Sequence, residues 1–173
     1  PMLNARFSVF QTSIEDANEI SFFFAEGIGG DNSSFVQEIM QGISKKYQGL
    51  EVGIEGQILP SLKLKGAASV GEYIYGNNPN VYLTSDDFGY LDFGEAKMKN
   101  LKIATGAQHA YSFGFEFREN YWWFGMTSNY FENTYLDVSP INRTQNFLID
   151  RDGLPFNDYN VDLARSLLEQ EKF

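Results

Sequence analysis

Few residues of this chain could form a catalytic centre. His109 is the only histidine among 173 residues, and the absence of cysteine removes Cys–His pairs, disulfides and thiolate metal sites. A Ser–His–Asp triad is possible by composition, but no G-x-S-x-G turn supplies the serine. A lone histidine on a strand is more often structural, and zinc would need an unusual carboxylate-rich site. We therefore expect no catalytic residue, no metal site and no cofactor.

Acidic residues gather where a loop could bind calcium. Asp86 and Asp87 are followed by Asp92 and Glu95, and carboxylate oxygens are the ligands that calcium prefers. The spacing is not that of an EF-hand loop, and a solvated loop explains these residues more simply. Calcium binding stays open at the level of the sequence.

Two other motifs are too incomplete to indicate a site. Glu51 and Glu55 would lie about 13 Å apart on one face of a strand, which is too far for the paired carboxylates of a glycosidase. The glycine-rich segment Gly27–Gly30 follows a strand-like segment, but no phosphate-binding fingerprint accompanies it.

The overall composition excludes two classes of protein. The net charge of -10, from 23 acidic and 13 basic residues, is opposite to what nucleic-acid binding requires. No segment approaches the roughly 20 apolar residues of a membrane-spanning helix, although aromatic residues make up 16% of the chain. The chain begins Pro-Met-Leu-Asn without a basic and apolar leader, so we expect no signal peptide.

The aromatic run from Tyr111 to Met126 has the pattern of a β-hairpin with one apolar face. Large aromatic residues alternate with small or polar ones, which is the period of two that a strand imposes. With Glu119 and Asn120 as a two-residue turn, Phe117 would lie opposite Trp122, and the apolar side chains would gather on one face.

A second hairpin is predicted around Pro60. Residues 50–54 alternate between aliphatic and acidic or glycine residues, and residues 62–70 alternate in the same way with lysine, alanine and serine. Folding the chain at Pro60 places Glu55 opposite Lys65, so this hairpin also has a charged face and an apolar face.

The rest of the chain predicts shorter elements and long connections. Residues 5–13 and 19–25 are expected to be two strands separated by a turn, whereas residues 33–43 fit a helix and a strand equally well. Residues 76–106 show little regular pattern, and residues 161–173 have the apolar stripe of a helix. Tight turns at one end of a sheet and long loops at the other are typical of outer-membrane barrels.

The cluster Tyr121-Trp122-Trp123 allows three interpretations: core packing, stacking on a sugar, or a belt at a membrane interface. Its position directly after a tight turn favours the belt, because lipid headgroups lie at that level of a transmembrane barrel.

The two hairpins together define two faces. A soluble sheet would turn the apolar face to a core, whereas a barrel would turn it to lipid, and the long loops favour the barrel. The residues expected to face lipid or to form an aromatic girdle are Leu50, Val52, Ile54, Leu62, Leu64, Val70, Tyr111, Phe113, Phe115, Phe117, Trp122, Phe124 and Met126. The residues expected to face the lumen are Glu51, Glu55, Lys63, Lys65 and Glu116.

Three stretches of the chain are specific enough to compare with a known family: YQGLEVGIE at residues 47–55, GEYIYGNNPNV at residues 71–81 and YWWFGMTSNYF at residues 121–131. With them, most of the chain resembles the late barrel of TonB-dependent outer-membrane receptors, in particular the subgroup with a carboxypeptidase-regulatory-like domain ahead of the plug. The segments ARFSVFQTSIEDANEISFFFAEG and LARSLLEQEKF extend the resemblance toward both ends.

This resemblance implies that residues 1–173 are part of a barrel of roughly 22 strands. The expected fold class is all-β, an antiparallel meander of about six or seven long transmembrane strands with a short helix near the C-terminus. The plug, the TonB box and the closing strands would lie elsewhere in the full-length protein.

The implied function is active uptake of a scarce nutrient (a metal chelate, a glycan or a peptide) across the cell outer membrane. The implied partners are outer-membrane lipid and, in the full-length protein, TonB and the nutrient, with no enzyme activity. One alternative is a self-contained small barrel or sandwich that binds a ligand, either soluble or in the outer membrane. Another is a soluble carbohydrate-binding or hydrolytic sandwich that uses the tryptophan pair as a sugar platform.

Overall fold

The computed structural model describes residues 3–26, 33–86 and 89–144. These residues form an all-β fold with seven strands in one antiparallel sheet and a 3-10 turn at Ile141–Arg143. In this part of the chain, no helix is long and apolar enough to cross a membrane. The expected helix at residues 161–173 lies outside the described residues.

The strands confirm the expectation of a long-stranded antiparallel sheet. They are β1 (Leu3–Glu26), β2 (Ser33–Leu59), β3 (Leu62–Tyr75), β4 (Asn80–Ser85), β5 (Gly89–Glu95), β6 (His109–Glu119) and β7 (Trp122–Glu132). Their order is β5-β4-β2-β3-β6-β7, and β1 pairs along the other edge of β2. Because β2 has 27 residues, its second edge is shared between β4 and β3.

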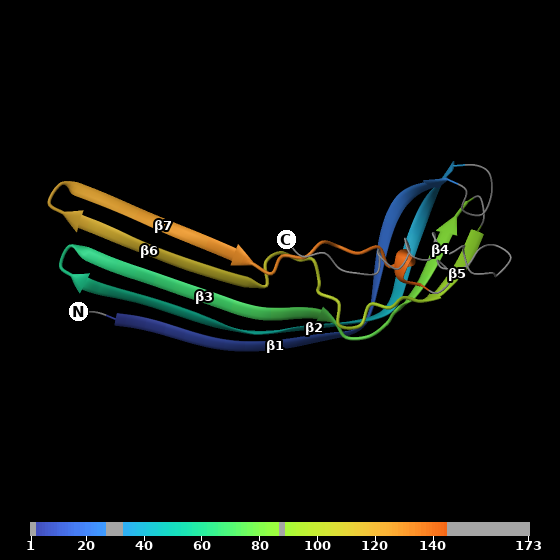
Figure 1. Ribbon diagram of the computed structural model, residues 1–173, viewed down its shortest axis with the longest axis horizontal. Coiled ribbons are helices and arrows are strands. Elements are labelled where there is room, and N and C mark those ends of the chain that lie inside the picture. The colour runs from blue at the N-terminus through green and yellow to red at the C-terminus, as the bar shows by residue number, and fades with distance from the viewer. Residues whose placement is uncertain (1–2, 27–32, 87–88, 145–173) are drawn as a thin grey trace, which may run out of the picture.

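The sheet divides into an arm and a lobe, as Figure 1 shows. The arm has the order β1-β2-β3-β6-β7 and contains residues 3–14 of β1 and 45–59 of β2. The lobe contains the remainder of β1 and β2, which curve away and pair with β4 and β5. Both tight turns lie at the free end of the arm, and the long connection from β5 to β6 leads from the lobe back to the arm. Strands β1, β3 and β7 therefore run toward the lobe, and β2 and β6 run away from it.

Two opposed bulges produce the bend between arm and lobe. The turn expected between residues 13 and 19 is wrong, because β1 continues through this segment with register shifts and with Asp16 at a φ of 55°. At the same level of β2, Gly42 has a φ of 70°. Extra residues at such positions bend a strand and increase its twist. The two bulges together turn both strands without breaking their ladder.

The lobe decides one alternative that the sequence left open and corrects one expectation. Residues 33–43, which fit helix and strand equally, belong to β2. Their burial alternates as in a strand at Val36, Glu38 and Met40, and the bulge at Gly42 then shifts the alternation so that Ile43 is buried as well. Of residues 76–106, expected to show little regular structure, the part from Asn80 to Glu95 forms the short hairpin of β4 and β5.

The buried hydrophobic core lies in the lobe. Its packed cluster consists of Met40, Ile43, Tyr75, Val81, Ala96, Met98 and Ile103, and Val36 and Leu83 are buried as well. A backbone hydrogen bond from Ile103 N to Tyr73 O ties the connection after β5 to the sheet, and one from Lys97 N to Arg143 O ties it to the 3-10 turn. The large apolar side chains of the arm, in contrast, stay open to the surroundings, with Phe7 68% and Val52 40% exposed.

The two hairpins of the arm differ in how well their registers were predicted. Pro60 and Ser61 connect β2 and β3, and Glu55 lies opposite Lys65 as expected. In the aromatic hairpin the turn is Asn120-Tyr121, so that Phe117 pairs with Phe124 and the expected pairing with Trp122 is wrong. The register differs from the expected one by two residues, which keeps every side chain on its expected face.

Candidate functional site

One face of the arm is a continuous apolar surface, which we call the apolar band. Directly paired residues point to the same face of a sheet, and the pairing of the five arm strands brings these side chains together. Its members are Leu3, Ala5, Phe7, Val9, Leu50, Val52, Ile54, Leu62, Leu64, Val70, Tyr111, Phe113, Phe115, Phe117, Trp122, Phe124, Met126 and Tyr130. All residues expected to face lipid are among them.

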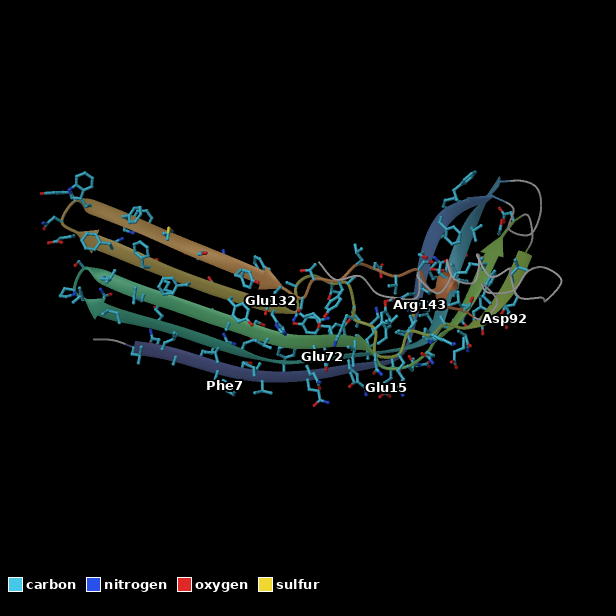
Figure 2. The ribbon with its side chains drawn as sticks, viewed as in Figure 1. Phe7, Glu15, Glu72, Asp92, Glu132 and Arg143 are labelled. Carbon is cyan, nitrogen blue, oxygen red and sulfur yellow. The ribbon has the colours of Figure 1, made fainter. Side chains whose placement is uncertain are left out.

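The extent of the apolar band is limited along the strands. On β3 it runs from Leu62 to Val70, about nine residues, and a tilted transmembrane strand needs roughly 9–11. At the lobe end, polar side chains replace it on the same face: Gln48 donates a hydrogen bond to Glu72 over 3.1 Å, and Lys102 forms an ion pair with Glu72. We call these residues, together with His109 and Glu132, the polar rim. Figure 2 labels two of them, Glu72 and Glu132, near the junction of arm and lobe.

Aromatic residues concentrate at the opposite, turn end of the band. Tyr121 is 102% and Trp122 is 79% exposed, and the ring of Phe115 lies 5.6 Å from that of Phe124. Trp122 and Trp123 point to opposite faces of β7, since Trp123 pairs with Arg118 on the other side of the sheet. The two rings therefore do not form one flat platform for a sugar.

The other face of the arm carries charged and small residues, and we call it the polar face. Glu51, Glu55, Lys63, Lys65 and Glu116, the residues expected to face a lumen, all lie on it. Lys63 Nζ lies 2.6 Å from Glu55 Oε1, and Lys65 forms an ion pair with Glu116. Both pairs are partly exposed, so solvent screens them and neither is a main source of stability.

Small side chains leave the polar face hollowed. Gly53, Ala67 and Ser112 lie in adjacent strands and line two open hollows of about 330 and 510 Å³. The same hollows are bordered by Arg6 of β1 and by Asn129 or Thr127 of β7. The arm is thus a single layer with an apolar surface on one side and a hollowed, polar surface on the other.

His109 has a structural environment on the polar rim. Its Nδ1 lies 3.1 Å from Glu132 Oε1 and 3.0 Å from Asn133 Nδ2, and the Tyr111 hydroxyl donates to the same Glu132 oxygen over 3.3 Å. These contacts tie β6 to the end of β7. The hydrogen bonds of the His109 ring within the described residues include no serine, so no Ser–His–Asp triad is assembled there.

The candidate calcium ligands are spread along the β4–β5 hairpin. Asp92 accepts a hydrogen bond from Gly94 N, and Glu95 accepts one from Asn78 Nδ2. Asp86 lies in the turn after β4. Across the described ranges, no group of three or more acidic or histidine side chains is placed to hold a metal ion. Asp87 and the Gly27–Gly30 segment lie outside these ranges.

The lobe contains a hollow that sequence reasoning missed, which we call the lobe hollow. Its volume is about 560 Å³, and it lies between the Glu19–Phe23 stretch of β1 and residues 137–140. Glu38, only 7% exposed, forms part of its wall and accepts hydrogen bonds from Ser21 Oγ (3.0 Å) and Ile141 N (3.3 Å). Burial raises the pKa of the Glu38 carboxyl. An acidic residue at an otherwise apolar position of β2 was the available signal.

A second buried charge lies in the 3-10 turn. Arg143 is 4% exposed, and its Nε and Nη2 atoms have no hydrogen-bond partner within the described structure. Burial also lowers the pKa of this guanidinium.

Comparison with protein-family models, with curated proteins and with solved structures finds no match to this chain.

Proposed function

We propose that this chain forms part of the wall of an outer-membrane β-barrel that belongs to an active nutrient transporter. In this arrangement the apolar band contacts lipid and the polar face lines the lumen. The observation that carries the proposal is the apolar band itself: a single-layer face of exposed and half-exposed aliphatic and aromatic side chains, about nine residues long on β3. Transmembrane barrels expose such a band to lipid.

The two borders of the apolar band support the same assignment. Tyr121 and Trp122 lie at the end of the tight turns, where interfacial aromatic girdles are found in outer-membrane barrels. The polar rim with Glu72 and Lys102 lies at the end of the long connections. Short turns face the periplasm and long loops face outside in such barrels, so the lobe would be the outward part.

The class of transporter is inferred from the sequence. The stretches at residues 47–55, 71–81 and 121–131 resemble the late barrel of TonB-dependent receptors. The full-length protein would then use TonB to drive uptake of a metal chelate, a glycan or a peptide. The Glu51–Lys65 region of the polar face would lie on the inner wall of its barrel.

The proposal is tested with neighbouring residues of β2 that point to opposite faces. Because the chain has no cysteine, Glu51→Cys and Val52→Cys each provide one site for an environment-sensitive fluorophore in vesicles. We expect brominated lipid tails to quench the label at position 52 and to leave the label at position 51 unquenched. The pair Phe115→Cys and Glu116→Cys repeats the test on β6. Equal quenching at both positions of each pair would contradict the proposal.

A further inference from the structure

The lobe hollow has the volume of a small-molecule site. Its volume of about 560 Å³ lies within the range of roughly 300–1,000 Å³ that is usual for ligand pockets. One side is the edge strand β1, the other side is the segment 137–140, and Met40 and Tyr75 lie on its floor. Of the hollows described, it is the one that reaches into the buried core of the lobe.

The polar groups of the lobe hollow favour positive charge. Glu19, Glu38 and Asp137 contribute three carboxyl groups, and its lining contains no lysine, arginine or histidine. Lys45, next to the hollow, shows how this wall receives an ammonium group. It forms an ion pair with Glu19, and its Nζ lies 5.4 Å from the centroid of the Tyr75 ring, an arrangement in which ring and carboxylate both attract the cation.

Glu38 differs from the other two carboxyl groups in its burial and its partners. Its two hydrogen bonds come from the neutral donors Ser21 and Ile141. Among the ion pairs of the described residues, none includes Glu38. A buried carboxylate without a cationic partner is unfavourable, and it gains free energy when a cation binds beside it. Met40, Val138 and Pro140 line the same hollow and add apolar surface to it.

We propose that the lobe hollow binds a small organic cation, an ammonium or guanidinium group on an apolar body, and that Glu38 receives the charged group. If the chain belongs to a nutrient transporter, this names the class of its ligand, and to that extent the inference rests on the proposed function. The binding itself requires only the folded lobe and no membrane.

The experiment measures binding of 2-phenylethylammonium to the purified full chain by calorimetry, with 2-phenylethanol as the uncharged counterpart. We expect the ammonium to bind at one site, and Glu38→Gln, which keeps the shape of the side chain, to weaken it about 10- to 100-fold. Glu51→Gln, on the polar face of the arm, is the matched control and should leave the affinity unchanged. Asp137→Asn, an exposed position, should weaken binding about 2- to 5-fold and covers the case in which the Glu38 variant fails to fold.

Three results would overturn the inference. They are equal affinity of phenylethanol and the ammonium, equal effects of the Glu38 and Glu51 substitutions, or calcium ions alone binding with the same dependence on Glu38. The outcome is distinguishable from that of the lipid-quenching test. Ammonium binding without lipid contact would leave this site standing and remove the transporter, and lipid contact without ammonium binding would do the reverse.

Discussion

Gly49 and Gly71 lie opposite each other across β2 and β3, and the ring of Phe10 and the ring of Tyr73 fill the space that their side chains would occupy. A Cβ atom on Gly49 would lie 2.6 Å from the carbonyl oxygen of Val70 and 2.8 Å from the Phe10 ring. The rings of Phe10 and Tyr73 are 6.4 Å apart. The absence of side chains on Gly49 and Gly71 thus leaves room for the rings of Phe10 and Tyr73 on the polar face, close to the bend.

Gly49→Ala is therefore expected to destabilise the fold. The substitution forces a backbone oxygen as well as a ring to move, which typically costs about 1–3 kcal/mol. Gly53→Ala is the matched control, because it lies on the same face of β2 and a Cβ atom added there would meet no atom within 4 Å. The free energy of unfolding in urea measures both. Equal values for the two variants would show that the cluster is not tightly packed.

The aromatic hairpin depends on the backbone conformation of Asn120. Its φ of 50° is tolerated by asparagine and glycine and is unfavourable for β-branched residues. We expect Asn120→Val to lower the free energy of unfolding by about 1–2 kcal/mol and Asn120→Gly to change it little. Thermal unfolding followed by tryptophan fluorescence reports on Trp122 and Trp123 directly. If Asn120→Val left the free energy of unfolding unchanged, Asn120 would not have the positive φ on which this turn depends.

This turn also shows what the sequence could predict and what it could not. Strict alternation in β2, β3, β6 and β7 was enough to assign both faces of the arm, and the opposite charges of Glu55 and Lys65 defined one register. In the aromatic hairpin, both candidate turns place aromatic residues opposite aromatic residues. The choice between them rests on the φ of Asn120, which pattern does not report.

The lobe was less predictable because its bulges interrupt the alternation. The bulge at Gly42 shifts the alternation of the strand by one residue. Val36 and Met40 before it and Ile43 after it are therefore all buried, and their spacing of four and three residues imitates a helical stripe. The bulge at Asp16 resembles a turn in sequence, since acidic residues are common in both. The lobe hollow was missed because Glu38 is surrounded by residues of three separate segments.

Arg143 offers a test of the cost of a buried charge. Its Nε and Nη2 are buried without a described partner, and an apolar side chain of similar length avoids that desolvation cost. We expect Arg143→Met to leave the free energy of unfolding unchanged or to raise it by about 1–3 kcal/mol. Arg118→Met, at the exposed turn end of the arm, should be neutral. A strong loss of stability in the Arg143 variant would mean that the guanidinium is paired in solution.

Glu38 is expected to make stability depend on pH. Its pKa is raised from 4.5 by burial, so between 4.5 and the raised value the folded state binds more protons than the unfolded state. The contribution of Glu38 to stability is therefore fully present below pH 4.5 and is lost as the pH rises through the raised pKa. The difference in unfolding free energy between the wild type and Glu38→Gln, followed across this range, should show that decline. A difference that grows with pH in favour of the wild type would contradict it.

The strand directions of the arm restrict the number of further strands that could close it into a ring. Its order β1-β2-β3-β6-β7 contains five strands, so both outer strands point the same way and cannot join each other in an antiparallel ladder. Any closed antiparallel ring that includes this arm needs an odd number of further strands, and three would complete the smallest common ring of about eight. A designed protein that closes this arm into an antiparallel ring can therefore add one strand or three strands, but not two.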